Sequence, residues 1–182
     1  MNQVYHTSKQ QKYPPHVRGA LIFERFFFWM ISGAVTFFVA SLLIKFFIVD
    51  GGIIEGPSME PNFISNQRFI INKTAYLFST PHRGDVVQII ENSQLIIKRV
   101  IGIPGDTVTI KQGTVWLNNK KLWEPYLPQF TQTTILAQHG ELFYQLKAQE
   151  YFILGDNRSQ STDSRMFGPV SRRIIIGKVI NF

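Results

Sequence analysis

Two residues in this sequence can form a catalytic pair: Ser58, in the segment EGPSMEPN, and Lys98, in the segment QLIIKRVIGI. A serine hydroxyl attacks a carbonyl carbon when a base takes its proton, and a lysine amine becomes such a base when burial lowers its pKa. Apolar residues flank Lys98, so we expect its strand to be buried on at least one face. The Gly/Pro turn around Ser58 can aim backbone N–H groups at one point, as an oxyanion hole does.

Each of these residues also has a structural alternative. A serine between glycine and proline is often only a turn residue. Alternation along a strand can leave either Lys98 or Arg99 facing solvent. Taken singly, neither Ser58 nor Lys98 establishes a catalytic site.

Histidine is the other possible base for a serine nucleophile. His6 and His16 precede the long apolar run of the chain, whereas His82, in TPHRGD, and His139, in AQHGE, follow it. The last two remain possible bases, although a solvated loop role is the commoner one for a histidine in such a turn.

A third polar segment, GDNRSQSTDSRMFGPV at residues 155–170, follows the apolar run EYFIL. Its two aspartates and two arginines can form internal ion pairs, and its serine hydroxyls can donate or accept hydrogen bonds. Such a loop can be rigid, lie against a site and orient a lysine amine through a hydroxyl. The charged residues are Asp156, Arg158, Asp163 and Arg165.

The elements that would position these residues are mainly β-strands. Short β-branched runs alternate with turn residues; they are RFIINK, DVVQII, LIIKRVIGI, DTVTIKQGTVWLNN, EYFILGD and IIIGKVINF. In VWLNNKKL we predict a hairpin turn at Asn118 and Asn119, which tolerate positive φ. Residues 122–149 break the pattern, and we expect an irregular excursion with a structural role there.

The amino-terminal part contains an uncharged run, Phe26–Ile44, long enough to cross a membrane as a helix. A buried core helix or a cleavable signal peptide is the alternative, but the run exceeds a signal peptide's apolar region and no small-x-small site follows it closely. We therefore expect a tail at residues 1–25, a transmembrane helix at 26–49 and a β-rich domain at 50–182.

The charges around this run predict its direction in the membrane. Glu24 is the acidic residue that opposes the basic residues before the run. These basic residues are Lys9, Lys12, Arg18 and Arg25. Because cytoplasmic flanks carry the excess of Lys and Arg, we expect a cytoplasmic tail and an extracytoplasmic domain on the plasma or inner membrane.

The composition narrows the function classes further. The chain has no cysteine, which excludes disulfides, thiol catalysis and cysteine-ligated zinc. Its net charge of +7 is scattered, with no basic helix carrying interleaved aromatic residues, so nucleic-acid binding is not favoured. We expect no cofactor and no metal, a monomer, and the lipid bilayer as one partner.

Four motifs in order after the apolar run resemble those of the type I signal peptidase family: EGPSMEPN, RGDVVQI, IIKRVIGIPGDTV and GDNRSQSTDSRMFG. The resemblance implies a signal-peptidase-like β-rich catalytic domain. It also implies that Ser58 is the nucleophile, Lys98 the general base, and Ser161 the hydroxyl that orients the lysine. Asp163 and Arg165 match the pair that supports the loop.

The resemblance assigns the oxyanion hole to backbone N–H groups near Gly56 and Ser58, since glycine stands where some members have a serine hydroxyl. Two residues depart from the family pattern. Pro57 precedes the nucleophile, where it fixes φ and removes a donor, and Asn62 replaces a threonine. Both departures concern the geometry of the turn.

The family's substrates are exported preproteins cut after a small-x-small site, bound as an added β-strand. By position, four apolar residues are candidates for the shallow pockets: Ile54, Met59, Ile96 and Ile97. The alternatives are a specialised peptidase for one pilin or conjugation protein, a self-cleaving Ser/Lys protease of the repressor type, and an inactive peptide-binding domain.

Overall fold

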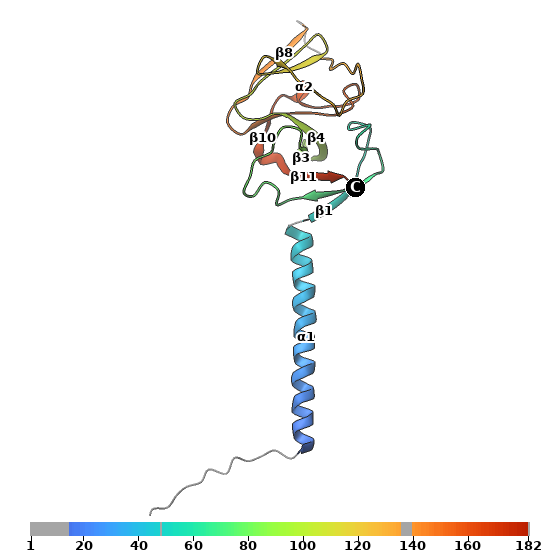
Figure 1. Ribbon diagram of the computed structural model, residues 1–182, viewed down its shortest axis with the longest axis vertical. Helices are drawn as coiled ribbons and strands as arrows, with labels where there is room; N and C mark the ends of the chain where they lie inside the picture. The colour runs from blue at the N-terminus through green and yellow to red at the C-terminus, as the bar shows by residue number, and fades with distance from the viewer. Residues whose placement is uncertain (1–14, 48, 136–139, 182) are drawn as a thin grey trace, which may run out of the picture. The chain divides into compact units, whose positions relative to one another are not determined.

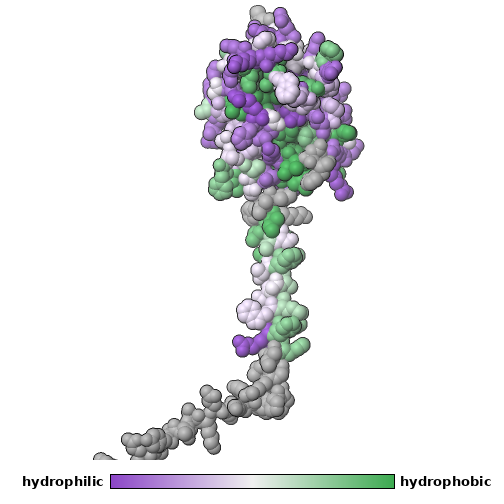
Figure 2. All heavy atoms as spheres, in the orientation of Figure 1, coloured by the Kyte–Doolittle hydropathy of each residue, from purple (hydrophilic) through white to green (hydrophobic). Residues whose placement is uncertain are grey.

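The computed structural model describes residues 15–47, 49–135 and 140–181. The chain divides into two compact units, residues 1–44 and 45–182, and each is described here by itself. Helix α1 (Pro15–Phe47) contains the stretch Phe23–Ile44, whose 22 residues are long and apolar enough to cross a membrane. Figure 2 shows the apolar side chains along this stretch, and none of it is buried. The predicted anchor is therefore a single helix that fits one span.

The second unit contains two antiparallel sheets. The larger sheet has the order β1-β2-β11-β3-β4-β9-β10, and the smaller one has the order β7-β6-β5-β8. In Figure 1, β8 lies at the end of this domain farthest from β1. The larger sheet comprises β1 (Val49–Ile53), β2 (Arg68–Asn72), β3 (Val86–Glu91), β4 (Gln94–Gly102), β9 (Glu150–Leu154), β10 (Val170–Ser171) and β11 (Ile175–Asn181). The smaller sheet comprises β5 (Thr107–Lys111), β6 (Thr114–Leu117), β7 (Lys120–Lys121) and β8 (Glu141–Gln145).

The two sheets share a core. Buried side chains at the end of β4 and along β9, such as Ile101 and Phe152, pack with Val108 and Ile110 of β5. Because β4 contributes to this core and also carries Lys98, the position of Lys98 is held by packing on both sheets. Two short helical turns complete the domain, α2 (Ser164–Phe167) and the 3-10 turn η1 (Arg172–Ile174).

The mainly β fold predicted from the sequence is confirmed. Every β-branched run contains a strand, and the predicted hairpin turn is present between β6 and β7, with positive φ at Asn118 and Asn119. The prediction missed β1, whose sequence VDGGI contains two glycines and lacks the composition of a strand.

The stretch 122–149 is not irregular throughout, as we had expected. Residues Glu141–Gln145 form β8, which pairs along its length with β5. Its side chains alternate between exposed and half-buried, the pattern of a strand with one face on the domain. The expectation failed because the segment is short and lies among polar residues.

Candidate active site

Ser58 lies on a turn that is fixed on both sides. Ile54, just after β1, is bonded to the backbone of Gln67 at 2.9 Å. The chain then reverses at Gly56, whose φ of +81° is costly for a residue with a side chain. After Ser58, the carbonyl of Met59 accepts the Phe63 N–H at 3.0 Å, and the Met59 side chain is buried in the core. The nucleophile candidate therefore has a defined position.

Lys98 reaches this turn from the middle of β4. Its Nζ donates hydrogen bonds to Ser58 Oγ at 2.9 Å and to the carbonyl of Ile97 at 2.9 Å. The side chain is only 3% exposed, and this burial lowers the pKa of Lys98 to about 8, against the opposing fields of Asp163 and Asp156. The neutral share of the amine near physiological pH is therefore far larger than for an exposed lysine, as a general base requires.

Neither Lys98 nor Arg99 faces solvent freely, although alternation along the strand could have left one of them exposed. The two side chains point to opposite faces of β4. The Arg99 side chain is only 12% exposed and forms an ion pair with Asp156 on the face of β4 opposite to Lys98. Both faces of this strand are covered at the site.

The GDN segment packs directly against the serine turn. The Asn157 N–H donates to the Ser58 carbonyl at 3.1 Å. A Cβ at Gly155 would lie 2.5 Å from that same carbonyl and 2.1 Å from Ser161 Oγ, so only glycine fits. The turn that holds the nucleophile and the loop at residues 155–163 are thus in direct backbone contact.

Ser161 lies in the site but is not joined to Lys98. Its buried Oγ has no hydrogen-bond partner among the described residues, and it packs against Gly155. The amine of Lys98 is directed instead by the Ile97 carbonyl. Orientation of the lysine by Ser161 stays a prediction.

Asp163 and Arg165 form the ion pair expected of them, with Arg165 Nε 2.8 Å from Asp163 Oδ1. Asp163 is fully buried, caps α2 and accepts the Gly155 N–H at 3.0 Å. Arg165 also donates to the carbonyls of Arg158 and Ser161. The pair ties both ends of the loop together.

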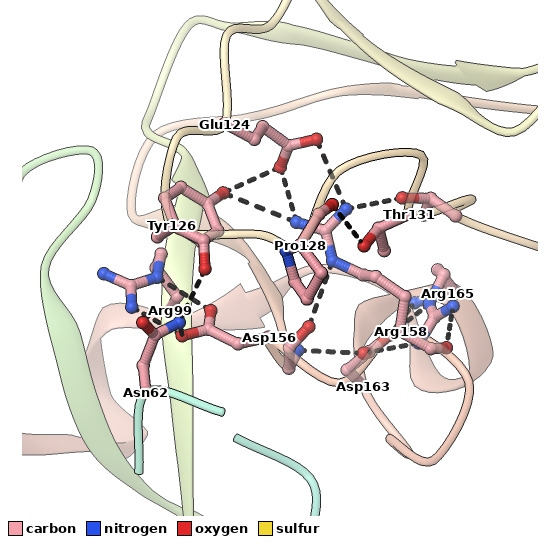
Figure 3. Close-up of polar contacts among 12 residues, drawn as sticks. Asn62, Arg99, Glu124, Tyr126, Pro128, Thr131, Asp156, Arg158, Asp163 and Arg165 are labelled. Carbon is pink, nitrogen blue, oxygen red and sulfur yellow. Dashed lines mark hydrogen bonds and ion pairs between the residues drawn. The ribbon is translucent and has the colours of Figure 1, made fainter. Parts of the chain in front are cut away.

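Sequence reasoning missed a second group of contacts, drawn in Figure 3, that holds the loop from the side of residues 122–135. Arg158 is 2% exposed and donates from both terminal nitrogens to Glu124, and also to Thr133. Glu124 is 34 positions away in an irregular stretch, where a single acid gives no indication of its partner. The sequence suggested ion pairs within the loop, but Asp156 pairs with Arg99 and Arg158 with Glu124, both outside it.

Asn62, noted from the sequence as a departure, connects three segments (Figure 3). Its Nδ2 donates to Asp156 Oδ2 at 2.9 Å and to the Tyr126 carbonyl at 2.8 Å. Arg99 stacks over the Tyr126 ring at 4.2 Å while it pairs with Asp156. The threonine of the family pattern carries a single hydroxyl donor and cannot make both of these hydrogen bonds.

A groove of about 620 Å³ runs over the dyad. Ser58 and Lys98 line it, as do all four residues predicted for the pockets, Ile54, Met59, Ile96 and Ile97. It lies between β1 and the first half of β4. In the described part of the chain, β1 pairs only with β2, and β9 pairs with β4 only from Arg99 onward. Among the described residues, therefore, two strand edges without a neighbouring strand border the groove.

The histidines do not join the site as far as the structure describes them. His82 is 73% exposed and lies 3.7 Å from Asp85 in its own turn. His139 and His6 lie outside the described residues, as does the side chain of His16. Within the described residues, no cluster of three or more His, Asp or Glu side chains could hold a metal ion.

The sequence that forms this site is similar to known proteins. A family model described as "Signal peptidase, peptidase S26" matches residues 27–182. Signal peptidase I V of Bacillus subtilis (strain 168) is 33% identical over 162 residues, which cover 84% of this chain and 95% of that protein. Signal peptidase IB of Staphylococcus aureus (strain COL) is 35% identical over 168 residues, covering 83% and 85%. A crystal structure of a signal peptidase I from Enterococcus faecalis V583 is 29% identical, with a TM-score of 0.47, and covers 55% of this chain and 97% of that one.

Proposed function

Because the chain belongs to the signal peptidase family, peptidase S26, we propose that Ser58 and Lys98 are the nucleophile and general base with which it cuts peptide bonds. The protein is a membrane-bound serine endopeptidase of the signal peptidase I type. The observation that carries the assignment is the 2.9 Å hydrogen bond between the Lys98 amine and the Ser58 hydroxyl. It joins a buried base to a nucleophile inside a groove.

In the first half of the reaction, neutral Lys98 accepts the Ser58 proton while Oγ forms a bond to the scissile carbonyl carbon. The developing oxyanion receives hydrogen bonds from backbone N–H groups of the Gly56–Ser58 turn. Within the described part of the chain, no hydrogen bond occupies the Ser58 N–H. The Lys98 ammonium then gives its proton to the leaving amine, the C–N bond breaks and an acyl-enzyme forms.

In the second half, water replaces the departed amine. Lys98, neutral again, takes a proton from the water as its oxygen attacks the acyl carbon. The Ser58 ester bond breaks, and the proton returns from Lys98 to Oγ. One lysine serves in both steps, and no carboxylate needs to relay the proton.

The substrate is an exported preprotein whose segment before the cut lies extended in the groove. The open edges of β1 and β4 can both add main-chain hydrogen bonds to such a strand. The apolar side chains of Ile54, Met59, Ile96 and Ile97 limit the depth beside the dyad, which favours small residues before the scissile bond.

The domain lies on the extracytoplasmic side and the amino-terminal tail in the cytoplasm. The support is the excess of Lys and Arg before the span, opposed there only by Glu24. Substrates reach the domain through the same membrane, so one shared surface raises the effective concentration of each for the other. Protease added outside sealed cells should digest residues 51–182 and spare the tail; the reverse pattern excludes this topology.

The assignment is tested with purified protein and a preprotein bearing a small-x-small site. Ser58→Ala and Lys98→Ala should each abolish cleavage, whereas two matched controls outside the groove, Ser79→Ala and Lys111→Ala, should retain it. If the dyad variants cleave at the wild-type rate, the assignment is wrong. If cleavage needs the dyad but does not require small residues before the cut, the proposed pockets are wrong.

A further inference from the structure

Two buried polar side chains line the active-site groove in the described part of the chain. One is Lys98, which the proposed mechanism uses. The other is Gln88, in the middle of β3, which is 7% exposed and has no role in that mechanism. Its neighbours along the strand are valine and isoleucine, so a glutamine interrupts an otherwise aliphatic run, VVQII. The amide of Gln88 has two N–H donors and an acceptor that require partners.

The sheet offers this amide no polar partner. Gln88 stands opposite Ile97 on β4 and opposite Gly177 on β11. Residues opposite each other in antiparallel strands project to the same face, so the amide has an aliphatic side chain on one side and a glycine on the other. The buried cluster that lines this groove includes Phe69 and Ile71, which are apolar as well. Among the described residues, the Gln88 side chain makes no hydrogen bond.

The polar atoms of Gln88 are accessible from the groove rather than sealed in the core. In the part of the chain that the structure describes, the fully buried polar side-chain atom without a partner is Ser161 Oγ. The Gln88 amide also lacks a partner but is not fully enclosed, and its residue lines the groove. An amide in apolar surroundings is disfavoured unless another group supplies its hydrogen bonds. A polar group of a bound substrate can supply them.

The strand register indicates which substrate residue meets Gln88. Val87 is opposite Lys98, so Gln88 lies one strand away from β4 and one register position away from Lys98. With about 3.4 Å per residue and about 4.8 Å between strands, the Cα atoms of Gln88 and Lys98 are about 6 Å apart. In an extended substrate, the first side chain before the cut lies beside the dyad, and the third projects to the same face about 7 Å away. The position of Gln88 therefore matches the third residue.

A hydroxyl is the substrate group that suits this position. The hydroxyl of serine or threonine both donates and accepts a hydrogen bond, as the glutamine amide does. Both side chains are also small, and the groove beside the dyad is shallow because Ile54 and Met59 limit its depth. A hydroxyl can therefore satisfy the amide without the additional space that a longer polar side chain requires.

Resting on the proposed function, we propose that Gln88 is a specificity-determining residue, which hydrogen-bonds a serine or threonine hydroxyl at the third position before the scissile bond. The apolar residues of the groove select for small size at this position. Gln88 adds a selection for polarity among the small residues. Serine is then preferred to alanine there, and threonine to valine.

The test uses the purified full-length protein and peptides that carry alanine before the cut and differ only at the third position. Threonine and valine form the decisive pair, because they have nearly the same shape and differ by a hydroxyl. The wild type should show a kcat/KM for threonine roughly fivefold above that for valine, the effect of one neutral hydrogen bond. In Gln88→Met, which keeps the length but removes the amide, this ratio should fall to one or below. The matched control is Gln94→Met, since Gln94 is an exposed glutamine of the same groove, and its ratio should stay at the wild-type value.

The ratio compares two substrates on one preparation, so it does not depend on the amount of folded protein. A wild-type ratio of one or less overturns the proposal, and this result needs no variant to fold. An unchanged ratio in Gln88→Met also overturns it, because the hydroxyl is then bound elsewhere. A preference for threonine at the first position instead of the third contradicts the register. Cleavage that persists in Ser58→Ala would refute the proposed function, whereas cleavage that needs Ser58 but ignores the hydroxyl refutes only the role of Gln88.

Discussion

Lys98 and Arg99 are neighbours in β4, yet their surroundings differ in the one respect that determines their chemistry. Lys98 is buried against Ser58 and the Ile97 carbonyl, and among the described residues no carboxylate forms an ion pair with it. Arg99 is half-buried and forms an ion pair with Asp156, which balances its charge. Burial without a paired carboxylate disfavours the charged form of a basic side chain and lowers its pKa. A basic side chain that is paired with a carboxylate keeps its charge and serves a structural role.

The same difference separates two regions around the loop at residues 155–163. On the dyad side, contacts to the loop are made by backbone groups and neutral side chains. On the other side, each buried arginine has its own carboxylate, and these pairs are Arg99–Asp156, Arg158–Glu124 and Arg165–Asp163. The first region supplies a reactive amine, and the second holds the loop in place. Substitutions in the two regions should therefore have opposite effects on stability.

The largest expected effect is on activity at Lys98. Lys98→Met should reduce kcat/KM by roughly 10⁴-fold or more, since the Ser58 proton has no acceptor. Lys98→Arg should be equally inactive, because a guanidinium does not deprotonate. Peptide cleavage by equal amounts of folded protein measures this loss, and near-normal activity of either variant removes Lys98 from the mechanism.

The Lys98→Met variant should also be more stable than the wild type. The pKa of Lys98 is lowered from 10.5 to about 8 by burial, so the folded state binds the lysine proton more weakly than the unfolded state. Wild-type stability therefore rises as the pH increases from about 8 toward 10.5. At neutral pH, methionine removes a penalty of up to about 3 kcal/mol. Thermal unfolding in detergent checks the direction, and a lower Tm contradicts it.

Removal of the neighbouring cation should have the opposite effect on stability. Arg99→Met leaves Asp156 buried without its arginine, which should cost roughly 3–5 kcal/mol of the free energy of unfolding. The control is Arg83→Met, whose bidentate pair with Asp106 involves an arginine side chain that is 46% exposed. A smaller loss is expected there. If both variants lose the same stability, burial does not determine the role of these pairs.

A smaller effect is expected at Glu124. Glu124→Gln keeps the shape but removes the charge opposite Arg158, so the loop should hold the Ser58 carbonyl less firmly. We expect kcat to fall about tenfold, KM to change little and the Lys98 limb of the pH profile to stay in place, as for a positioning residue. Glu141→Gln, on an exposed edge of β8, is the control. A shift of the pH limb in Glu124→Gln would assign the glutamate a different role.

The smallest effect is expected for Asn62→Thr, which restores the family residue. The variant loses the two hydrogen bonds that the Asn62 side-chain amide donates to Asp156 and to the Tyr126 carbonyl, each contributing about 1 kcal/mol. Stability should fall by about 1–2 kcal/mol and activity by only a few-fold, as measured by denaturant unfolding and kcat/KM. Unchanged stability would show that Asn62 does not connect these segments energetically.

The strands and the dyad were within reach of sequence reasoning, for different reasons. The β-branched runs and turn residues carry local information, so the strands after β1 follow from periodicity, except β8 and the two-residue β10. The catalytic roles of Ser58 and Lys98 could not be predicted from either residue alone. They were predicted because four motifs occur in the family order. The pairing of Asp163 with Arg165 was accessible too, since both residues lie in one short loop.

The missed contacts all depend on tertiary structure. Glu124 and Tyr126 meet Arg158 and Arg99 only because the chain after β7 folds back over the loop, and nothing local to their sequence indicates this. Strand β1 is held by its register with β2 despite its glycines. The coverage of both faces of β4 likewise follows from how the segments pack, which is why Arg99 could be mistaken for a solvent-facing residue.

The most direct test of the account is the pH dependence of kcat/KM with a soluble peptide substrate. If neutral Lys98 is the base, log kcat/KM should rise with unit slope as the pH increases and level off above an apparent pKa near 8. A profile that is flat through the acidic range, or one that rises only near the ordinary lysine pKa of 10.5, would contradict the claim that burial without a paired carboxylate makes Lys98 the catalytic base.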